Sequence, residues 1–184
     1  MRTVHLPLAP GPSGESRPGH VRIRAIHPSD SCELRSFYAG LSAASRQTRF
    51  LVVSAGVSEA QSRSFCTPDH AHEKGFVAVV GDGRDGVDRI VGHLCLERDG
   101  ADAAEVAIAV ADAFQRRGIG RMLLAMGAAW ALGAGIRRLT ATMCAGNAPI
   151  HRLLVGLGLP ARMSYTGAGV ADITIELAAD RAAA

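Results

Sequence analysis

The sequence contains no long hydrophobic run, no closely spaced cysteine pair and only one lysine. No stretch among its 184 residues approaches the roughly 18 uninterrupted apolar residues of a membrane helix, so we expect no contact with a membrane. The four cysteines stand far apart, which argues against a disulfide framework or a zinc knuckle and favours reduced thiols. The first residues carry no apolar segment of the kind found in secretory signals. Together these absences predict a cytoplasmic protein.

Charge is sparse and nearly balanced. Lysine and arginine number 20 against 17 aspartate and glutamate residues, a formal net charge of +3, and Lys74 is the single lysine. So small an excess does not by itself indicate a nucleic-acid partner, and we expect none. The positions of the arginines along the chain are therefore more informative than their number.

The composition is that of a globular domain. Hydrophobic residues make up 48% of the chain, and a domain of about 150 residues buries roughly 70% of its unfolded surface. Prolines and glycines concentrate in residues 1–20, which we predict to form a flexible arm. Residues 21–178 then form one domain, followed by a disordered tail over 179–184.

Strand and helix patterns follow one another along this domain. Apolar and polar residues alternate over 21–26, as in a half-buried strand, and apolar residues recur with helical spacing from Ile119. We expect strands over 21–26, 75–80, 89–97, 104–110, 138–144, 162–166 and 172–177, and helices from 28–30 to about Leu41 and over 58–66, 119–132 and 148–157. The fold class is therefore α/β (α+β), with a mostly antiparallel first half.

The most informative segment is a strand over 104–110 that leads through a basic, glycine-containing loop into a helix. The first turn of a helix has N–H groups without intrahelical partners and the positive end of the helix dipole. Gly118 and Gly120 allow close approach of a ligand to the backbone, and Arg116, Arg117 and Arg121 add positive charge. The segment is thus a candidate site for a phosphate or pyrophosphate.

Three phosphate-binding patterns compete for this segment. A Walker loop requires Gly-Lys-Ser/Thr, and the segment has no lysine. A dinucleotide fingerprint requires a third glycine where this chain has Leu123. The pattern that remains is Q/R-x-x-G-x-G/A, formed by Gln115, Gly118 and Gly120.

With this motif the chain resembles the GNAT family of N-acetyltransferases. The resemblance extends over 21–177 and includes the preceding strand, the apolar helix and the later Asn147…Leu157-Gly158-Leu159 segment. It implies a central, mostly antiparallel mixed sheet of six to seven strands flanked by helices, with strands four and five, 104–110 and 138–144, splayed apart. It also implies transfer of an acetyl group from acetyl-CoA to a primary amine.

The same resemblance implies which residues hold the coenzyme. The pyrophosphate would bind the loop, the pantetheine arm would lie between the splayed strands, and an asparagine would contact the coenzyme further along. The residues at these places are Gln115, Arg116, Arg117, Gly118, Ile119, Gly120 and Arg121 in the loop, Ala109 and Val110 on the strand, and Asn147. Glu105 matches the position of a catalytic base in many members, and no metal is implied.

One departure from the family pattern concerns the general acid. Many members carry a tyrosine in the helix that follows Asn147, and this chain has Leu154 there. A thiolate is already a fair leaving group, because thiol pKa values lie near 8.5. The loss is therefore compatible with catalysis. Tyr165 and Cys144 are weak substitutes.

A second resemblance concerns the acceptor. Residues 41–50, LSAASRQTRF, are similar to the LSxxSRxxRF stretch of bacterial protein-lysine acetyltransferase domains. This favours a protein lysine as acceptor, with a small-molecule amine as the alternative. A sensor that binds acyl-CoA without turnover and a partner-binding domain without coenzyme stay open as well. By analogy with the family, a homodimer could form through the C-terminal strands, with 172–177 as a candidate edge.

Overall fold

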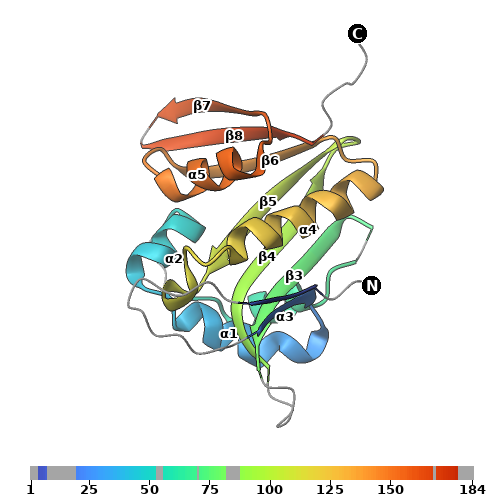
Figure 1. Cartoon of the computed structure of the whole chain (residues 1–184), viewed down its shortest axis with the longest axis vertical. Coiled ribbons are helices and arrows are strands. Elements are labelled where there is room, and N and C mark those ends of the chain that lie inside the picture. Colours follow the sequence, from blue (N-terminus) through green and yellow to red (C-terminus); the bar gives the residue numbers. More distant parts are fainter. Residues whose placement is uncertain are drawn as a thin grey trace.

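The computed structural model describes residues 4–7, 20–52, 56–69, 71–81, 88–167 and 169–177. Within these residues, eight strands form one sheet in the order β1-β2-β3-β4-β5-β6-β8-β7 (Figure 1). The strands are β1 (Val4–Pro7), β2 (His20–Ala25), β3 (Glu73–Val80), β4 (Arg89–Asp99), β5 (Ala103–Val110), β6 (Arg138–Cys144), β7 (Ala161–Gly167) and β8 (Val170–Glu176).

Helices cover both faces of this sheet. They are α1 (Ser31–Ala39), α2 (Ala43–Phe50), α3 (Glu59–Cys66), α4 (Ile119–Gly133) and α5 (Ala148–Leu157), with short 3₁₀ helices η1 (Pro28–Asp30) and η2 (Asp112–Phe114). No helix among the described residues is long and apolar enough to span a membrane. The α/β fold with a mostly antiparallel mixed sheet is thus confirmed.

The pair β5–β6 is the parallel pair of the described sheet, and it separates along its length. The strands pair only at Ala103↔Arg138, Ala104↔Leu139 and Glu105↔Thr140, although β5 continues to Val110. The rest of β6 pairs with β8 on its other side. Figure 1 shows β5 and β6 diverging toward the end where α2 and α5 lie. The splay expected from the family resemblance is therefore present.

Two hydrophobic clusters hold the layers together. On one face, α4 packs on β4 and β5 through buried residues such as Leu94, Leu96 and Leu123. On the other face, α1 and α3 enclose a cluster that includes Leu34 and Tyr38. The sheet separates these clusters, so β5 presents alternate side chains to each of them.

The approach of α4 to the sheet depends on glycine. A Cβ atom built on Gly127 would lie 3.0 Å from Leu94 Cδ2, and one on Gly92 would lie 2.9 Å from Leu123 Cδ1. Both distances are shorter than normal contacts, so larger side chains would push helix and strand apart. This close packing fixes where the N-terminus of α4 lies relative to the end of β5.

The structure differs from the sequence-based expectations at three places. The sheet has one strand more than the six to seven expected, because Val4–Pro7, in the arm predicted to be flexible, pairs with the free edge of β2. The expected helix through Leu41 ends at Ala39, and Ser42 caps a separate α2, with Ser45 N–H donating to Ser42 Oγ. The candidate dimer edge, 172–177, is wrong, since β8 lies between β6 and β7 and is not an edge.

Two further expectations fall largely outside the described residues. These are the flexible arm predicted over 1–20, of which only Val4–Pro7 and His20 are described, and the tail at 179–184.

Candidate active site

The loop between β5 and α4 has the backbone shape that an anion-binding helix start requires. Gly118 is the N-cap of α4 and has φ +85°, and Arg116 has φ +59°. The first intrahelical bond runs from Met122 N–H to Gly118 O. The N–H groups of Ile119, Gly120 and Arg121 therefore lack intrahelical acceptors and sit at the positive end of a 15-residue helix.

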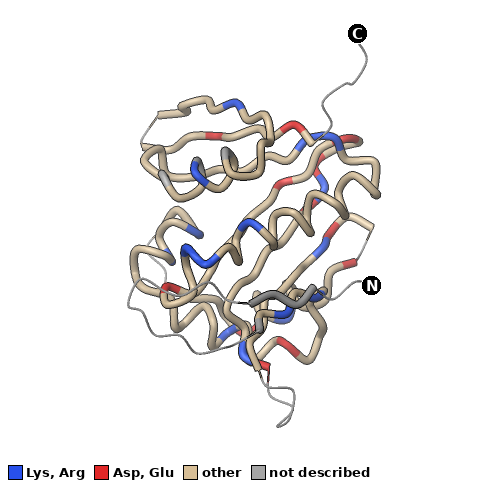
Figure 2. The backbone as a smooth tube through the Cα atoms, in the orientation of Figure 1, with Lys and Arg blue, Asp and Glu red and all other residues tan. Residues whose placement is uncertain are grey.

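The arginines of this loop add charge that no described carboxylate neutralises. Arg116, Arg117 and Arg121 form no ion pair with the acidic residues that the structure describes. Arg117 lies over the Phe114 ring, with its guanidinium carbon 5.5 Å from the ring centroid. Figure 2 shows basic positions along the loop that begins α4. The loop is therefore an electropositive segment suited to phosphate groups.

The open edge of β5 begins where this loop leaves the sheet. Ala111 N–H donates to Val91 O at 2.9 Å, and the register places His93 opposite Ala109. Because main-chain groups alternate between the two sides of a strand, those of Ala109 point toward β4 and those of Ile108 and Val110 point toward β6. This orientation favours Val110 over Ala109 for main-chain contact with a ligand between β5 and β6.

Gln115 is held by the protein itself. Its Nε2 donates to Val110 O at 3.1 Å and to Ser45 Oγ at 3.2 Å. The side chain therefore connects the loop to the end of β5 and to α2. Coenzyme contact by this side chain would compete with these two bonds.

Glu105 lies at the fork where β5 and β6 separate. It is the last β5 residue paired with β6, where it lies opposite Thr140. On its other side it pairs with Glu97 of β4. Its side chain is exposed, on the face of β5 where Ala109 packs against the α1–α3 cluster. A solvent-accessible carboxylate at the end of the open strand edge is suitably placed for a base.

A buried polar cluster lies under the same face of the sheet. His93 Nδ1 is 2.8 Å from Tyr38 Oη, and Arg49 donates from Nη2 to Cys95 Sγ at 3.3 Å. Burial, helped by the Arg49 charge, lowers the pKa of His93 to about 3, so the imidazole is neutral at physiological pH. Burial raises the pKa of the Cys95 thiol, and Arg49 partly opposes this. Neither His93 nor Cys95 is therefore charged at neutral pH.

The sequence-based reading missed this cluster. The signal available for it was a histidine inside an apolar strand, Gly92-His93-Leu94, opposite a helix that carries Tyr38.

The residues of the C-terminal half have structural partners. Asn147 caps α5, with Oδ1 accepting from Ile150 N–H at 3.3 Å. Leu154 is buried in the α4 cluster with 3% of its surface exposed. Tyr165 is 71% exposed on β7, and Cys144 ends β6. In the part of the chain that is described, no three His, Cys, Asp or Glu side chains lie close enough to hold a metal ion.

The splayed β5–β6 pair and the basic, glycine-containing loop that opens α4 form the arrangement that the resemblance to the GNAT family implies. Comparison with known families agrees. The model of the acetyltransferase (GNAT) family matches residues 43–158, and the chain belongs to this family.

Solved structures give the same result. The chain is similar to the GNAT domain of S. lividans PAT, with 26% identity and a TM-score of 0.78 over 95% of this chain and 96% of that one. It shares the fold of yncA from Salmonella typhimurium, solved with its cofactor acetyl-CoA, at 18% identity and a TM-score of 0.66 over 89% of this chain and 96% of that one.

A third similar structure is larger than this chain. The cAMP-binding acyltransferase from Mycobacterium smegmatis matches 95% of this chain but only 48% of its own length, at 21% identity and a TM-score of 0.57. No curated protein matches the chain.

Proposed function

We propose that this protein is an acetyl-CoA-dependent N-acetyltransferase that acts by direct attack of a primary amine on the bound thioester. The observation that carries this proposal is the continuity of three features. The electropositive start of α4, the open main-chain edge of β5 and the Glu105 carboxylate follow one another along a single strand and loop.

The coenzyme would occupy the first two of these features. Its pyrophosphate would accept hydrogen bonds from the N–H groups of Gly118, Ile119, Gly120 and Arg121, with Arg116 and Arg117 adding charge. Its pantetheine arm would pair with the open edge at Ile108 and Val110, as an extended ligand that adds a strand to a sheet. Acetyl-CoA in yncA, a protein of the same fold, supports this choice of donor.

Glu105 would serve as the general base. An alkyl amine has a pKa near 10.4 and is mostly protonated at neutral pH, so transfer requires that a proton be removed. The amine nitrogen then forms a bond to the acetyl carbon, and the carbon–sulfur bond breaks. Before this attack, the ammonium proton passes to the Glu105 carboxylate, directly or through water, and as the amide forms the second proton leaves the nitrogen for solvent. A strand N–H such as that of Val110 would stabilise the oxyanion that forms in between.

The leaving thiolate would take its proton from solvent. Leu154 is buried and apolar where many family members place a tyrosine, so α5 supplies no general acid at this position. Because the pKa of a thiol lies near 8.5, the thiolate is a good enough leaving group to depart without a general acid.

A lysine of a protein is the acceptor that we favour. Residues 41–50 resemble a stretch of bacterial protein-lysine acetyltransferase domains, and they form the turn after α1 and all of α2, beside β5 and β6. The similarity to the GNAT domain of S. lividans PAT supports the same choice. We place the reaction in the cytoplasm, and we propose neither a nucleic-acid nor a membrane partner.

Release of coenzyme A thiol from acetyl-CoA, measured with lysine peptides, free amino acids and polyamines, tests the proposal. We expect turnover with at least one lysine peptide and none without an amine. Binding of acetyl-CoA with no turnover on any amine would favour the second candidate, an acyl-CoA sensor. The buried Leu154 in place of a general acid is the observation that favours that candidate.

A further inference from the structure

Asp112, in the short helix η2 directly after β5, makes a set of contacts that the proposed chemistry does not use. Its carboxylate accepts three hydrogen bonds from the start of α2. Ser42 N–H donates to Oδ2 at 2.9 Å, Ser42 Oγ donates to Oδ1 at 2.8 Å, and Ser45 Oγ donates to Oδ1 at 2.7 Å. Two segments 70 residues apart in sequence are thereby joined.

A fourth contact extends the connection into the loop. Ser45 Oγ also accepts from Gln115 Nε2 at 3.2 Å, and the same amide donates to Val110 O at 3.1 Å. One chain of hydrogen bonds therefore runs from the end of β5 through Gln115 and Ser45 to Asp112.

Hydrogen bonding, without a cation, satisfies the Asp112 carboxylate. Partial burial raises its pKa, but bonds from Ser42 and Ser45 outweigh this and hold the pKa below the ordinary value. No described Lys or Arg forms an ion pair with it. The Asp112 carboxylate is thus bonded to α2 and does not neutralise the nearby arginines, which stay available to bind an anion.

Such contacts matter for α2 because this helix has no fully buried residue. At its far end, Arg49 donates to Cys95 Sγ and the Phe50 ring lies 5.3 Å from the Tyr38 ring. At its near end, Arg46 bonds to Ala39 O at the end of α1 and to Leu41 O in the turn that follows. Among the described residues, Asp112 in η2 and Gln115 in the loop therefore bond the near end of α2 to the segment between β5 and α4.

We propose that Asp112 is a positioning residue, which couples the loop 115–121 to α2 so that coenzyme binding orders the acceptor side of the site. This inference rests on the proposed function, because it takes the loop to be the coenzyme site. A ligand that stiffens the loop would stiffen α2 through Asp112 and Ser45, and an acceptor lying against α2 would then meet a helix that is already held. Without the Asp112 carboxylate, coenzyme binding would still order the loop but would no longer order α2.

Hydrogen exchange followed by mass spectrometry, with and without saturating coenzyme A, tests this inference. The measured quantity is the ratio of exchange rates without and with coenzyme A, taken separately for the loop 115–121 and for α2. In the wild type we expect coenzyme A to slow hydrogen exchange in both segments. In Asp112→Ala we expect the loop still to slow and the ratio for α2 to fall by about fivefold or more, the lower end of typical coupling between sites.

The ratio separates coupling from a merely structural role. A structural role would speed exchange in α2 equally with and without coenzyme A and leave the ratio unchanged. Ser45→Ala removes one of the three bonds to Asp112 together with the bond from Gln115, so it interrupts the same chain of hydrogen bonds at another point and serves if Asp112→Ala folds poorly. The conservative Asp112→Asn keeps one acceptor oxygen and should restore part of the ratio. Because the residues act as one unit, the double variant Asp112→Ala/Ser45→Ala should lose no more than the larger single loss.

Asp69→Ala is the matched control. Asp69 likewise accepts loop hydrogen bonds, from the N–H groups of Ala71, His72 and Glu73, but in another loop, and its loss should leave the α2 ratio at the wild-type value. If coenzyme A slows hydrogen exchange in the wild-type loop but not in α2, the inference is wrong and the proposed coenzyme site stands. The same holds if the α2 ratio is unchanged in Asp112→Ala. A wild-type loop that coenzyme A does not slow overturns the proposed coenzyme site and the inference together.

Discussion

Glu105 is the residue to which we assign the proton transfer in the proposed reaction. Glu105→Gln keeps the size of the side chain and removes the proposed base, so we expect kcat/KM at pH 7 to fall by about 10²-fold or more. The loss should narrow as the pH rises toward about 10, because the amine then loses its proton to solvent. Steady-state thiol release between pH 6 and pH 10 measures this.

Its cross-strand neighbour offers a control. Glu97 faces Glu105 across the β4–β5 pair, so Glu97→Gln changes the same charge one strand away. It should keep nearly full activity at every pH. Equal losses in the two variants would mean that local charge, not a base, is what the reaction needs.

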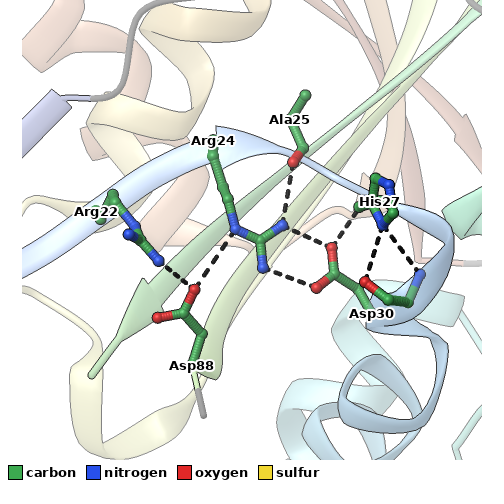
Figure 3. A network of polar contacts seen from close by, with 7 residues as sticks. Arg22, Arg24, Ala25, His27, Asp30 and Asp88 are labelled. Carbon is green, nitrogen blue, oxygen red and sulfur yellow. Dashed lines mark hydrogen bonds and ion pairs between the residues drawn. The ribbon is translucent and has the colours of Figure 1, made fainter. Parts of the chain in front are cut away.

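Asp30 governs stability at the start of α1. Figure 3 shows Arg24 between Asp30 and Asp88. Arg24 Nη1 and Nη2 each donate to one Asp30 carboxylate oxygen at 2.7 Å. His27 N–H adds a third bond at 2.8 Å. The Asp30 side chain is only 10% exposed, so its removal leaves the Arg24 cation without its main partner. We expect Asp30→Ala to lower the free energy of unfolding by about 2–3 kcal/mol.

The pH dependence of this loss has a definite sign. Burial raises the pKa of Asp30, but bonds from Arg24 and His27 outweigh it and hold the pKa below the ordinary value. The stabilisation is therefore present above about pH 4 and is lost as the pH falls through the lowered native pKa. Urea unfolding at pH 7 and at pH 3 should show the wild-type advantage shrinking at the lower pH. Glu59→Ala, which breaks only exposed pairs with Arg63 and Arg35, should cost less than about 1 kcal/mol at pH 7.

The loop that starts α4 can be tested as an element with a matched pair of glycines. Gly118 has φ +85° and Gly135 has φ +78°, and neither has an atom within 4 Å of an added Cβ. Alanine at either position should therefore cost a similar amount, about 1–2 kcal/mol. Only Gly118→Ala should also weaken acetyl-CoA binding, measured by calorimetry. Equal binding by both variants would contradict the assignment of the loop.

The packing of α4 on the sheet gives a second prediction about elements. Gly127→Ala gains about 1 kcal/mol of helix propensity but places a Cβ atom 3.0 Å from Leu94 and 3.2 Å from Leu96. We expect a net loss of about 1–2 kcal/mol by thermal unfolding. Gly133→Ala, at the end of the same helix with nothing within 4 Å, should be neutral or stabilising.

The sequence predicted elements better than it predicted contacts between them. The alternating and helical patterns located the strands of the domain, and Gln115, Gly118 and Gly120 located the loop. These signals are local, and local periodicity is visible in one chain. The contact between Asp112 and Ser42 joins positions 70 residues apart. Nothing in the sequence of either segment indicates that the two are in contact. The same holds for Tyr38 and His93, and for β1, whose pairing depends on a free edge of β2.

At the scale of the whole molecule, ligand binding should appear as global stability. Acetyl-CoA at about 100 times its dissociation constant adds roughly 2.7 kcal/mol to the free energy of unfolding. For a chain of this size the melting temperature should rise by about 5–10 °C. Acetyl-pantetheine, which lacks the pyrophosphate, should give a much smaller shift at equal concentration. Equal shifts would locate the binding energy away from the loop.

The parting of β5 from β6 has one more consequence. The groups that it presents are peptide amides and carbonyls, and every residue other than proline supplies the same pair. Exchange of one β5 side chain for another would leave this part of ligand recognition in place, provided the strand keeps its extended shape. In the site that we propose, side chains of this strand other than Glu105 would thus differ between related proteins and change the face toward the amine, while the main-chain contacts to the coenzyme stay the same.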